Sequence, residues 1–270
     1  MFRLGILQSS GALGSVSDRL SALDQTAKSL AGRADMLLTP ELFITGYAIC
    51  ADHAAEVAEP ANGRYARAIA AMAKKYGIAI VSGFPERHED RIYNSALAVG
   101  PDGATLALCR KLNLPMNYER NVFAPGDRLT SFSYHGLTFG MLICYDVEFP
   151  ECVRSLSQQG AQIVLVPTAL TTKWTRLTRT LVPTRAFENG IFVAYANHAG
   201  VDGPYELCGG SCLVGPLGFD VIRAGENEER IVGHIDVSEI ELARARLPYF
   251  ADLRSARWNK SLSKDRDQWL

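Results

Sequence analysis

The chain alternates between short apolar runs and amphipathic stretches, a pattern typical of buried strands interleaved with surface helices. Apolar runs of strand length occur at residues 2–8, 35–41, 78–83, 94–99, 104–109, 137–143, 162–166, 191–197, 210–214 and 231–236. Helical spacing predicts helices from Ser17 as N-cap to Gly32, over 64–76 and 150–157, within 170–189 and from about 238. This order predicts an α/β protein and is compatible with a sheet sandwich flanked by helices.

Two stretches interrupt the alternation. Pro101-Asp102-Gly103 lies between two apolar runs and is a hairpin signature. Residues 112–130 show no clear periodicity and are rich in Pro, Asn and Gly, and long irregular loops of this kind are often functional. Because no linker, internal repeat or low-complexity block divides the sequence, we expect a single domain over residues 1–270 with a C-terminal tail from about 247.

Composition narrows the class of protein. The 270 residues are 47% hydrophobic and 21% charged, which are ordinary values for a soluble globular protein. The net charge of −1 gives no electrostatic case for binding nucleic acid or an anionic membrane. The N-terminal apolar run is too short for a signal peptide, and no apolar stretch approaches the roughly 20 residues of a membrane helix. We therefore expect a cytoplasmic protein.

The six cysteines are expected to be reduced thiols, because no secretory signal accompanies them. Cys208 and Cys212, with His198 and His234 in the same half of the chain, raise the possibility of a metal site. Their spacing lacks the paired short motifs of zinc sites, so we expect no metal.

One cysteine stands out. The apolar run 137–143 stops at Cys144, and three acids and Pro150 follow within seven residues. Proline suits the first turn of a helix, so the segment predicts a strand, a sharp turn at Cys144 and a helix. A helix N-terminus favours a thiolate, and nucleophiles of other enzymes occupy similar elbows. The alternative is a buried structural cysteine, which is the usual environment of a free thiol.

Two other apolar runs also end in reactive side chains: the run from Asp35 ends in Glu41, and the run from Ala104 ends in Arg110 and Lys111. If these runs share a sheet with the Cys144 run in parallel sense, Glu41, Lys111 and Cys144 converge at one edge, where open α/β sheets bind ligands. A carboxylate, an ammonium group and a thiol suit acyl transfer: the carboxylate takes the thiol proton and the ammonium neutralises an oxyanion.

Three segments of the sequence resemble the signatures of a known enzyme superfamily. Residues 40–47 (Pro-Glu-Leu-Phe-Ile-Thr-Gly-Tyr), 110–114 (Arg-Lys-Leu-Asn-Leu) and the Cys144 segment resemble, in order, the three signatures of the nitrilase or carbon–nitrogen hydrolase superfamily. Supporting matches occur at residues 93–95, 118–120, 123–126 and 185–189. The resemblance extends from about Arg3 to Leu253.

The resemblance implies a four-layer αββα sandwich, commonly paired through helices into a homodimer. The tail from 247 carries Tyr249, Phe250, Trp258 and Trp269. In this family such tails often reach the partner subunit, and a frayed terminus is the alternative.

The resemblance also implies catalytic roles. Glu41 matches the general base, for which the alternative is a helix-capping or salt-bridged acid. Lys111 matches the lysine that holds the oxyanion together with the backbone N–H of Tyr145. Thiolate attack on an amide, loss of ammonia and hydrolysis of a thioester follow, with no metal or organic cofactor.

Three further residues match family positions. Glu119 matches a second glutamate that orients the lysine and positions substrate, and the alternative is a loop salt bridge with Arg120 or Arg128. Asp146 and Arg185 match positions usually regarded as structural, and we expect them to pair and brace the elbow.

The residues after the cysteine indicate the branch. Residues 144–151 (Cys-Tyr-Asp-Val-Glu-Phe-Pro-Glu) resemble the aliphatic amidases, most of all bacterial 5-aminopentanamidases. Nitrilase, N-carbamoyl amidohydrolase and a non-catalytic ligand-binding protein are the alternatives to a small-amide hydrolase. Glu148 is expected either to meet a protonated amine on the substrate or to pair with Arg154. Tyr118 and Trp174 are expected in loops around the substrate.

Overall fold

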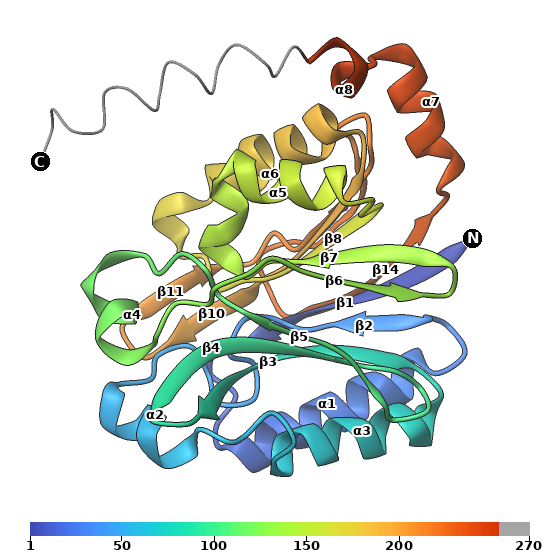
Figure 1. The fold of residues 1–270 in the computed structure, drawn as a ribbon. Coiled ribbons are helices and arrows are strands. Elements are labelled where there is room, and N and C mark those ends of the chain that lie inside the picture. Colours follow the sequence, from blue (N-terminus) through green and yellow to red (C-terminus); the bar gives the residue numbers. More distant parts are fainter. Residues whose placement is uncertain (254–270) are drawn as a thin grey trace, which may run out of the picture.

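The computed structural model describes residues 1–253, apart from the side chains of residues 116 and 117, and they form two facing sheets between two layers of helices (Figure 1). Helices α1 (Val16–Leu30) and α3 (Arg64–Tyr76) cover the outer face of one sheet. Helices α5 (Pro150–Gln158) and α6 (Arg176–Asn189) cover the outer face of the other. The predicted four-layer α/β sandwich is confirmed.

The larger sheet has eight strands in the order β11-β10-β1-β2-β3-β4-β5, and β14 also pairs with β1. Its strands are β1 (Phe2–Ser10), β2 (Met36–Leu38), β3 (Ala79–His88), β4 (Arg91–Val99), β5 (Thr105–Arg110), β10 (His198–Asp202), β11 (Tyr205–Cys208) and β14 (Glu229–Ile235). β3 runs parallel to β2, and the chain then reverses twice, at β4 and at β5. The ends of β2 and β5 that lead to Glu41 and Lys111 therefore lie at the same edge.

The smaller sheet has the order β13-β12-β9-β8-β7-β6. Its strands are β6 (Thr130–Tyr134), β7 (Leu137–Met141), β8 (Ile163–Pro167), β9 (Phe192–Ala196), β12 (Cys212–Val214) and β13 (Asp220–Arg223). β7 leads to Cys144, so the three candidate residues do not share one sheet, which was the condition considered for their convergence. Glu41 and Lys111 come from the larger sheet and Cys144 from the smaller one.

Several elements differ from their predicted bounds. The N-cap of α1 is Ser15 rather than Ser17, because the Ser15 side chain accepts from the N–H of Asp18 and the Asp18 carboxylate accepts from the N–H of Ser15. The stretch 112–130, expected to be irregular, contains α4. The remaining elements are α2 (Ala51–Val57), α4 (Met116–Val122), α7 (Ser238–Arg246), α8 (Tyr249–Asp252) and the 3₁₀ helices η1 (Cys144–Glu148) and η2 (Thr172–Trp174).

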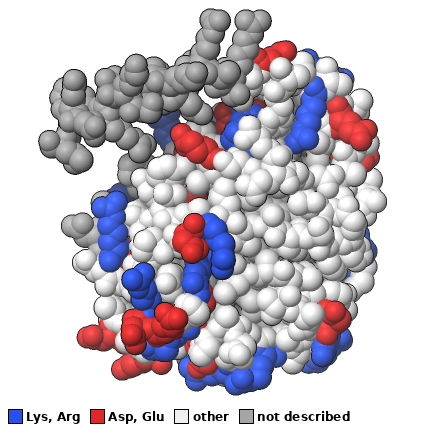
Figure 2. Space-filling model, in the orientation of Figure 1, with Lys and Arg blue, Asp and Glu red and all other residues white. Residues whose placement is uncertain are grey.

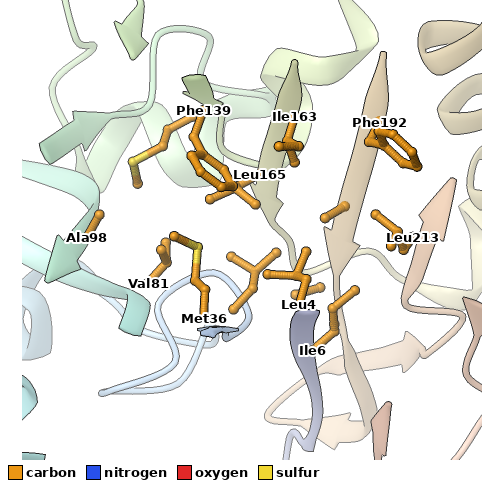
Figure 3. Packing of buried hydrophobic residues seen from close by; sticks show 14 of the residues in the cluster. Leu4, Ile6, Met36, Val81, Ala98, Phe139, Ile163, Leu165, Phe192 and Leu213 are labelled. Atoms are coloured by element: carbon orange, nitrogen blue, oxygen red, sulfur yellow. The ribbon is translucent and has the colours of Figure 1, made fainter. Parts of the chain in front are cut away.

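The main core lies between the two sheets, where side chains from both inner faces interdigitate (Figure 3). Leu4 and Met36 of the larger sheet and Phe139 and Leu165 of the smaller one are completely buried there. Burying an aliphatic or aromatic side chain of this kind contributes roughly 1.5–3 kcal/mol. Because this packing fixes the distance between the sheets, it also fixes the distance between the residues that follow their strands.

The surface carries charges of both signs, and the start of the predicted tail is helical. Acidic and basic side chains lie close to one another on the face shown in Figure 2, and within residues 1–253 every helix is too short or too polar to cross a bilayer. Tyr249 and Phe250 of the predicted tail belong to α8. Trp258 and Trp269 lie outside the described residues, so the proposed contact of the tail with a partner stays a prediction.

Candidate active site

Cys144 lies at a sharp elbow between β7 and α5, as predicted. The strand ends at Met141, and the chain turns through η1 before Pro150 begins the helix. The backbone of Cys144 has a φ of +46°, a left-handed conformation that costs a residue with a side chain roughly 1–2 kcal/mol. Strain at a buried cysteine means that surrounding contacts hold the elbow in this shape.

Asp146 provides the first of these contacts. Its carboxylate accepts hydrogen bonds from the backbone N–H groups of Ile143 at 3.2 Å, Leu112 at 3.2 Å and Asn113 at 2.8 Å. These bonds tie the elbow to the segment that follows Lys111. The Asp146 carboxylate thereby fixes the position of Cys144, which follows one sheet, relative to Lys111, which follows the other.

Arg185 provides the second contact. Its guanidinium donates to the carbonyl oxygens of Val147 at 2.9 Å and Glu148 at 2.7 Å, and it pairs with Glu188 at 2.9 Å. The expected pairing of Arg185 with Asp146 is therefore wrong. Asp146 and Arg185 each brace the elbow by hydrogen bonds from their own side chains to its backbone.

The Cys144 thiol is protonated at neutral pH. Burial raises the pKa of the thiol well above its usual range, and the Glu41 and Glu119 carboxylates raise it further while Lys111 acts in the opposite sense. Burial and the two carboxylates therefore oppose the thiolate that the helix N-terminus was expected to favour. Attack by this thiol therefore requires a base.

Glu41 lies in a tight turn three residues beyond β2. Leu42, the next residue, has a φ of +48°. Gly83 of β3 passes so close that an added Cβ would lie 2.5 Å from the Leu42 nitrogen. The predicted strand to Glu41 thus ends early, at Leu38, and Glu41 follows it in a strained turn.

The two oxygens of the Glu41 carboxylate have different surroundings. Oε1 accepts hydrogen bonds from Lys111 Nζ and from Asn94 Nδ2, both at 2.7 Å. Oε2 is buried and makes no hydrogen bond within residues 1–253. Buried carboxylate oxygens without a donor are uncommon, and a reacting group is one explanation for such an atom. The alternative of a capping or purely salt-bridged glutamate leaves Oε2 unexplained.

Lys111 is fully buried and lies between two carboxylates. Its Nζ donates to Oε1 of Glu41 and to Oε1 of Glu119, each at 2.7 Å. Burial disfavours the charge, but the two carboxylates outweigh burial and raise the pKa of Lys111 well above its usual value. An ammonium group has three N–H donors, so one remains after these two bonds.

Glu119 lies on α4 and is fully buried. Besides Lys111, its Oε1 accepts from the hydroxyl of Tyr47 at 2.9 Å. Burial raises the pKa of Glu119, and Lys111 opposes that rise. Arg120 donates to a backbone carbonyl and Arg128 is exposed beside Asp127, so the alternative of a loop salt bridge for Glu119 is wrong.

Glu41, Lys111 and Glu119 thus form a hydrogen-bonded chain, and Cys144 titrates under the influence of all three. A family model described as "Carbon-nitrogen hydrolase" matches residues 9–245 of the sequence. The chain belongs to the carbon–nitrogen hydrolase family. The resemblance inferred from three sequence signatures is confirmed at this level.

Relatives of this carbon–nitrogen hydrolase include amidases. An (R)-stereoselective amidase of a Pseudomonas species is 34% identical over 253 residues, which are 93% of this chain and 91% of the relative. The structure of an amidase from Nesterenkonia sp. AN1 superposes with a TM-score of 0.82 at 31% identity, covering 100% of both chains. In another structure, which covers 97% of each chain with a TM-score of 0.83 at 31% identity, a mutant of that amidase shows covalent addition of the acetamide moiety of fluoroacetamide at its active-site cysteine.

Tyr145 and Trp174, both predicted to bind substrate, differ in exposure: Tyr145 is partly buried and Trp174 is exposed. The Tyr145 ring packs edge-on against Phe149 with centroids 5.0 Å apart. Tyr145 follows Cys144 directly at the start of η1, and the contact of its backbone N–H with an oxyanion stays a prediction. Trp174 is 57% exposed on η2, and its contact with substrate stays a prediction.

Tyr118 supports the loop that follows Glu41. Its hydroxyl lies 2.7 Å from the carbonyl oxygens of Tyr47 and Ile49 and accepts from the N–H of Ile49 at 2.9 Å. Its ring packs against the rings of Tyr47 and Tyr205. Because the hydroxyl is fully engaged, any contact with substrate would involve the face or edge of the ring.

Glu148 is half-buried at the end of η1, and its carboxylate forms no ion pair within residues 1–253. Burial raises its pKa, whereas Lys111 and Arg185 lower it. The alternative of a Glu148–Arg154 pair is wrong, because the Arg154 guanidinium lies over the ring of Phe250, 4.8 Å from its centroid. Glu148 remains a candidate for contact with substrate.

Asn94, Tyr47 and His198 all touch the acidic residues of the site, and the sequence predicted an active-site role for none of them; His198 was considered only as a metal ligand. Counting back from the Asp102–Gly103 turn would place Asn94 opposite Arg110, but a register shift between Ala98 and Val99 moves it opposite Lys111, whose N–H donates to the Asn94 carbonyl at 2.8 Å. Tyr47 lies within the first family signature. No sequence signal marks His198.

The cysteines and histidines considered for a metal are dispersed. Cys212 packs in the core beneath α5 and α6, and His234 is exposed on β14. Among the described residues 1–253, no three His, Cys, Asp or Glu side chains are grouped to hold a metal ion.

Proposed function

We propose that this protein hydrolyses the C–N bond of a small aliphatic amide to a carboxylate and ammonia through a thioester on Cys144. The broader class is a cysteine-dependent amidase of the nitrilase superfamily. The observation that carries the proposal is Oε2 of Glu41, which is buried without a hydrogen-bond partner in residues 1–253 and acts on the pKa of a protonated thiol. An oxygen in this state can accept the thiol proton.

In the acylation step, Glu41 takes the proton of Cys144 as the sulfur attacks the amide carbonyl carbon. The carbonyl oxygen becomes an oxyanion, which the third N–H of Lys111 and the backbone N–H of Tyr145 can stabilise. Glu41 returns the proton to the amide nitrogen, the C–N bond breaks and ammonia leaves, so that the acyl group remains on sulfur.

In the deacylation step, Glu41 accepts a proton from water as the water oxygen attacks the thioester carbonyl. The same two donors meet the second oxyanion. The C–S bond then breaks, the sulfur regains a proton from Glu41, and the acid is released as its carboxylate. The overall reaction consumes one amide and one water, and no cofactor is needed.

Glu119 has a distinct role in this scheme. During each step Glu41 becomes neutral for a time, and Lys111 then loses one of its two negative partners. Glu119 still balances the ammonium at 2.7 Å, so Lys111 stays charged when the oxyanion forms. A buried lysine without this second carboxylate would tend to lose its proton.

The charge balance also suggests the kind of amide. Glu41, Glu119 and Glu148 contribute three carboxylates around a single ammonium group, that of Lys111. Such a site favours neutral amides, or amides bearing a protonated amine, over anionic ones. We therefore propose an amine-bearing aliphatic amide, such as a 5-aminopentanamide, as the preferred substrate class.

The test is a parallel measurement of ammonia release from an aliphatic amide, the corresponding nitrile and the corresponding carbamoyl compound, with wild type and Cys144→Ala. Release mainly from the amide, and none from the variant, supports the proposal. Faster release from the nitrile or the carbamoyl compound would instead favour a nitrilase or a carbamoyl hydrolase. Release from none of them, with Cys144 alkylation blocked by small amides, would indicate a non-catalytic ligand-binding protein.

A further inference from the structure

His198 is a fully buried histidine whose two ring nitrogens are both engaged beside the active site. Nε2 lies 2.8 Å from the backbone carbonyl oxygen of Glu41, and Nδ1 lies 2.7 Å from the hydroxyl of Ser9. Ser9 and His198 are register partners on the parallel strands β1 and β10. The imidazole therefore links two adjacent strands to the turn that carries the candidate base.

The chemistry of the partners fixes the tautomer. A carbonyl oxygen only accepts, so Nε2 carries the hydrogen and donates it to Glu41. Nδ1 then has a free lone pair, and the Ser9 hydroxyl donates to it. Burial lowers the pKa of His198 to about 4, so the ring is neutral at pH 7 and this arrangement is the resting one.

The turn at Glu41 needs such a contact. The Glu41 carbonyl belongs to the peptide unit that leads into Leu42, whose φ of +48° is disfavoured for a residue with a side chain. Rotation of that peptide unit would relieve Leu42 and change ψ of Glu41, and so would alter the turn that positions the Glu41 side chain. The N–H of Glu41 is held by the Thr168 carbonyl at 3.3 Å, and the carbonyl of Glu41 is held by His198.

We propose that His198 is a positioning residue for Glu41: its Nε2–H locks the Glu41 peptide so that carboxylate Oε2 faces the thiol of Cys144. Ser9 supports this role, because its hydroxyl selects the tautomer that can donate. The inference rests on the proposed role of Glu41 as the base. His198 itself touches neither the thiol nor substrate in this scheme.

The expected effect is on the chemical step. His198→Leu keeps an apolar side chain in the buried site but removes the donor, so kcat should fall about 10- to 100-fold, the scale of a misplaced catalytic group. KM should stay close to wild type, since substrate contacts are unchanged. His198→Gln retains an amide donor and should recover part of the kcat. Ser9→Ala should give a smaller loss of kcat. Ser9→Thr keeps the hydroxyl and should have a kcat close to wild type.

The experiment measures kcat, KM and the unfolding midpoint of these variants on an aliphatic amide. Tyr65→Phe is the matched control, because it removes another buried hydrogen bond, from the Tyr65 hydroxyl to the Val57 carbonyl at 2.8 Å, outside the site. A kcat loss in His198→Leu that exceeds the control at similar stability, with partial rescue by His198→Gln, supports the proposal. If His198→Leu does not fold, a kcat loss in Ser9→Ala that Ser9→Thr reverses supports it, and an unchanged kcat in Ser9→Ala overturns it.

Two results overturn the proposal and are distinguishable. A wild-type kcat in His198→Leu, while Glu41→Gln is inactive in the same assay, shows that Glu41 needs no such support. Wild-type turnover by Glu41→Gln would instead remove the proposed function of Glu41, and the positioning role would fall with it.

Discussion

Cys144 lies in a buried site whose neighbouring charges are two carboxylates and one ammonium group, and this balance determines where the protons reside. The Glu41 carboxylate raises the pKa of the thiol, and the thiol proton is the one that Glu41 must remove. The carboxylate therefore disfavours the thiolate in the resting enzyme. Transfer of the proton becomes favourable when an oxyanion forms between the remaining donors.

Glu41→Gln should separate the electrostatic role of Glu41 from its catalytic role. Removing the carboxylate lowers the pKa of Cys144, although burial keeps it above its usual value. The midpoint of Cys144 alkylation by a neutral reagent should therefore move to lower pH, while ammonia release falls about 10²- to 10⁴-fold.

Alkylation is followed on the peptide that contains Cys144, because Cys50 is exposed. Glu206→Gln, an exposed acid on β11, controls for the change in net charge. A midpoint that moves to higher pH in Glu41→Gln would show that the carboxylate does not disfavour the thiolate.

Glu148→Gln tests whether Glu148 recognises the charge of the substrate. The measurement is kcat/KM for an ω-amino amide and for its uncharged alkyl isostere. A half-buried carboxylate without an ion-pair partner in residues 1–253 should favour the amine by about 10- to 100-fold. The variant should lose most of that preference and retain its rate on the isostere. An equal ratio in both proteins would place selectivity elsewhere, for instance at Tyr118 and Trp174.

Residue types were predictable at this scale, and protonation states were not. Glu41, Lys111, Glu119 and Cys144 follow from apolar runs that end in polar residues and from three family signatures. Sequence spacing carries no information about burial, so it indicated a thiolate where burial raises the pKa of the thiol. The role of His198 depends on a contact across 157 positions of sequence, and no local pattern reports that distance.

At the scale of elements, the turn at Glu41 is shaped by β3. Gly83→Ala would place a Cβ 2.5 Å from the Leu42 nitrogen and 2.9 Å from the Pro40 carbonyl oxygen. We expect a loss of about 1–3 kcal/mol in the free energy of unfolding and a loss of kcat, because the turn must move. Denaturant unfolding and steady-state kinetics measure the two effects.

Gly225→Ala is the matched control for that substitution. The nearest neighbour of its added Cβ would be Oε2 of Glu229 at 3.9 Å, and its φ is not positive. It should leave kcat unchanged. Equal kinetics for the two alanine variants would mean that the Glu41 turn tolerates displacement.

The long periodic elements could be predicted from sequence and the short ones could not. Helix α3 and the β4–β5 hairpin follow from helical spacing and from the Asp102–Gly103 turn. The seven-residue helix α4 has too little periodicity to register among Pro and Asn residues. β10 and β11 pair at the sheet edge through backbone hydrogen bonds, which side-chain patterns do not reveal.

At the scale of the whole molecule, the site exists because two sheets pack face to face. Local patterns predict strands and the side chains at their ends, but they do not assign strands to sheets. A shared sheet was therefore the condition considered for Cys144 and Glu41 to converge, whereas the inter-sheet core brings them together from two sheets (Figure 3). The family resemblance supplied the four-layer arrangement that the pattern left open.

We predict that the protein forms a homodimer through the surface around α6. Phe187 on α6, Phe219 in the turn before β13 and Tyr249 on α8 are 37%, 76% and 40% exposed, and the Phe187 and Tyr249 rings lie 6.0 Å apart. Aromatic side chains of this kind are common interface anchors. Phe219→Asp should weaken association by about 2 kcal/mol or more, as measured by light scattering over a range of concentrations.

The control for that measurement is Val201→Asp, which adds a charge at a 56% exposed apolar residue on β10. It should leave the dimer intact. A wild-type protein that is monomeric at micromolar concentration would contradict the dimer prediction without affecting the proposed chemistry.

The most direct test of the central claim is the mass of acid-quenched enzyme during turnover of an aliphatic amide. Wild type should gain the mass of the amide minus that of ammonia, on the peptide that contains Cys144. This adduct should disappear when substrate is exhausted. Cys144→Ala should carry no adduct and release no ammonia. Ammonia release by Cys144→Ala at a rate close to wild type, with no adduct on the protein, would contradict the account.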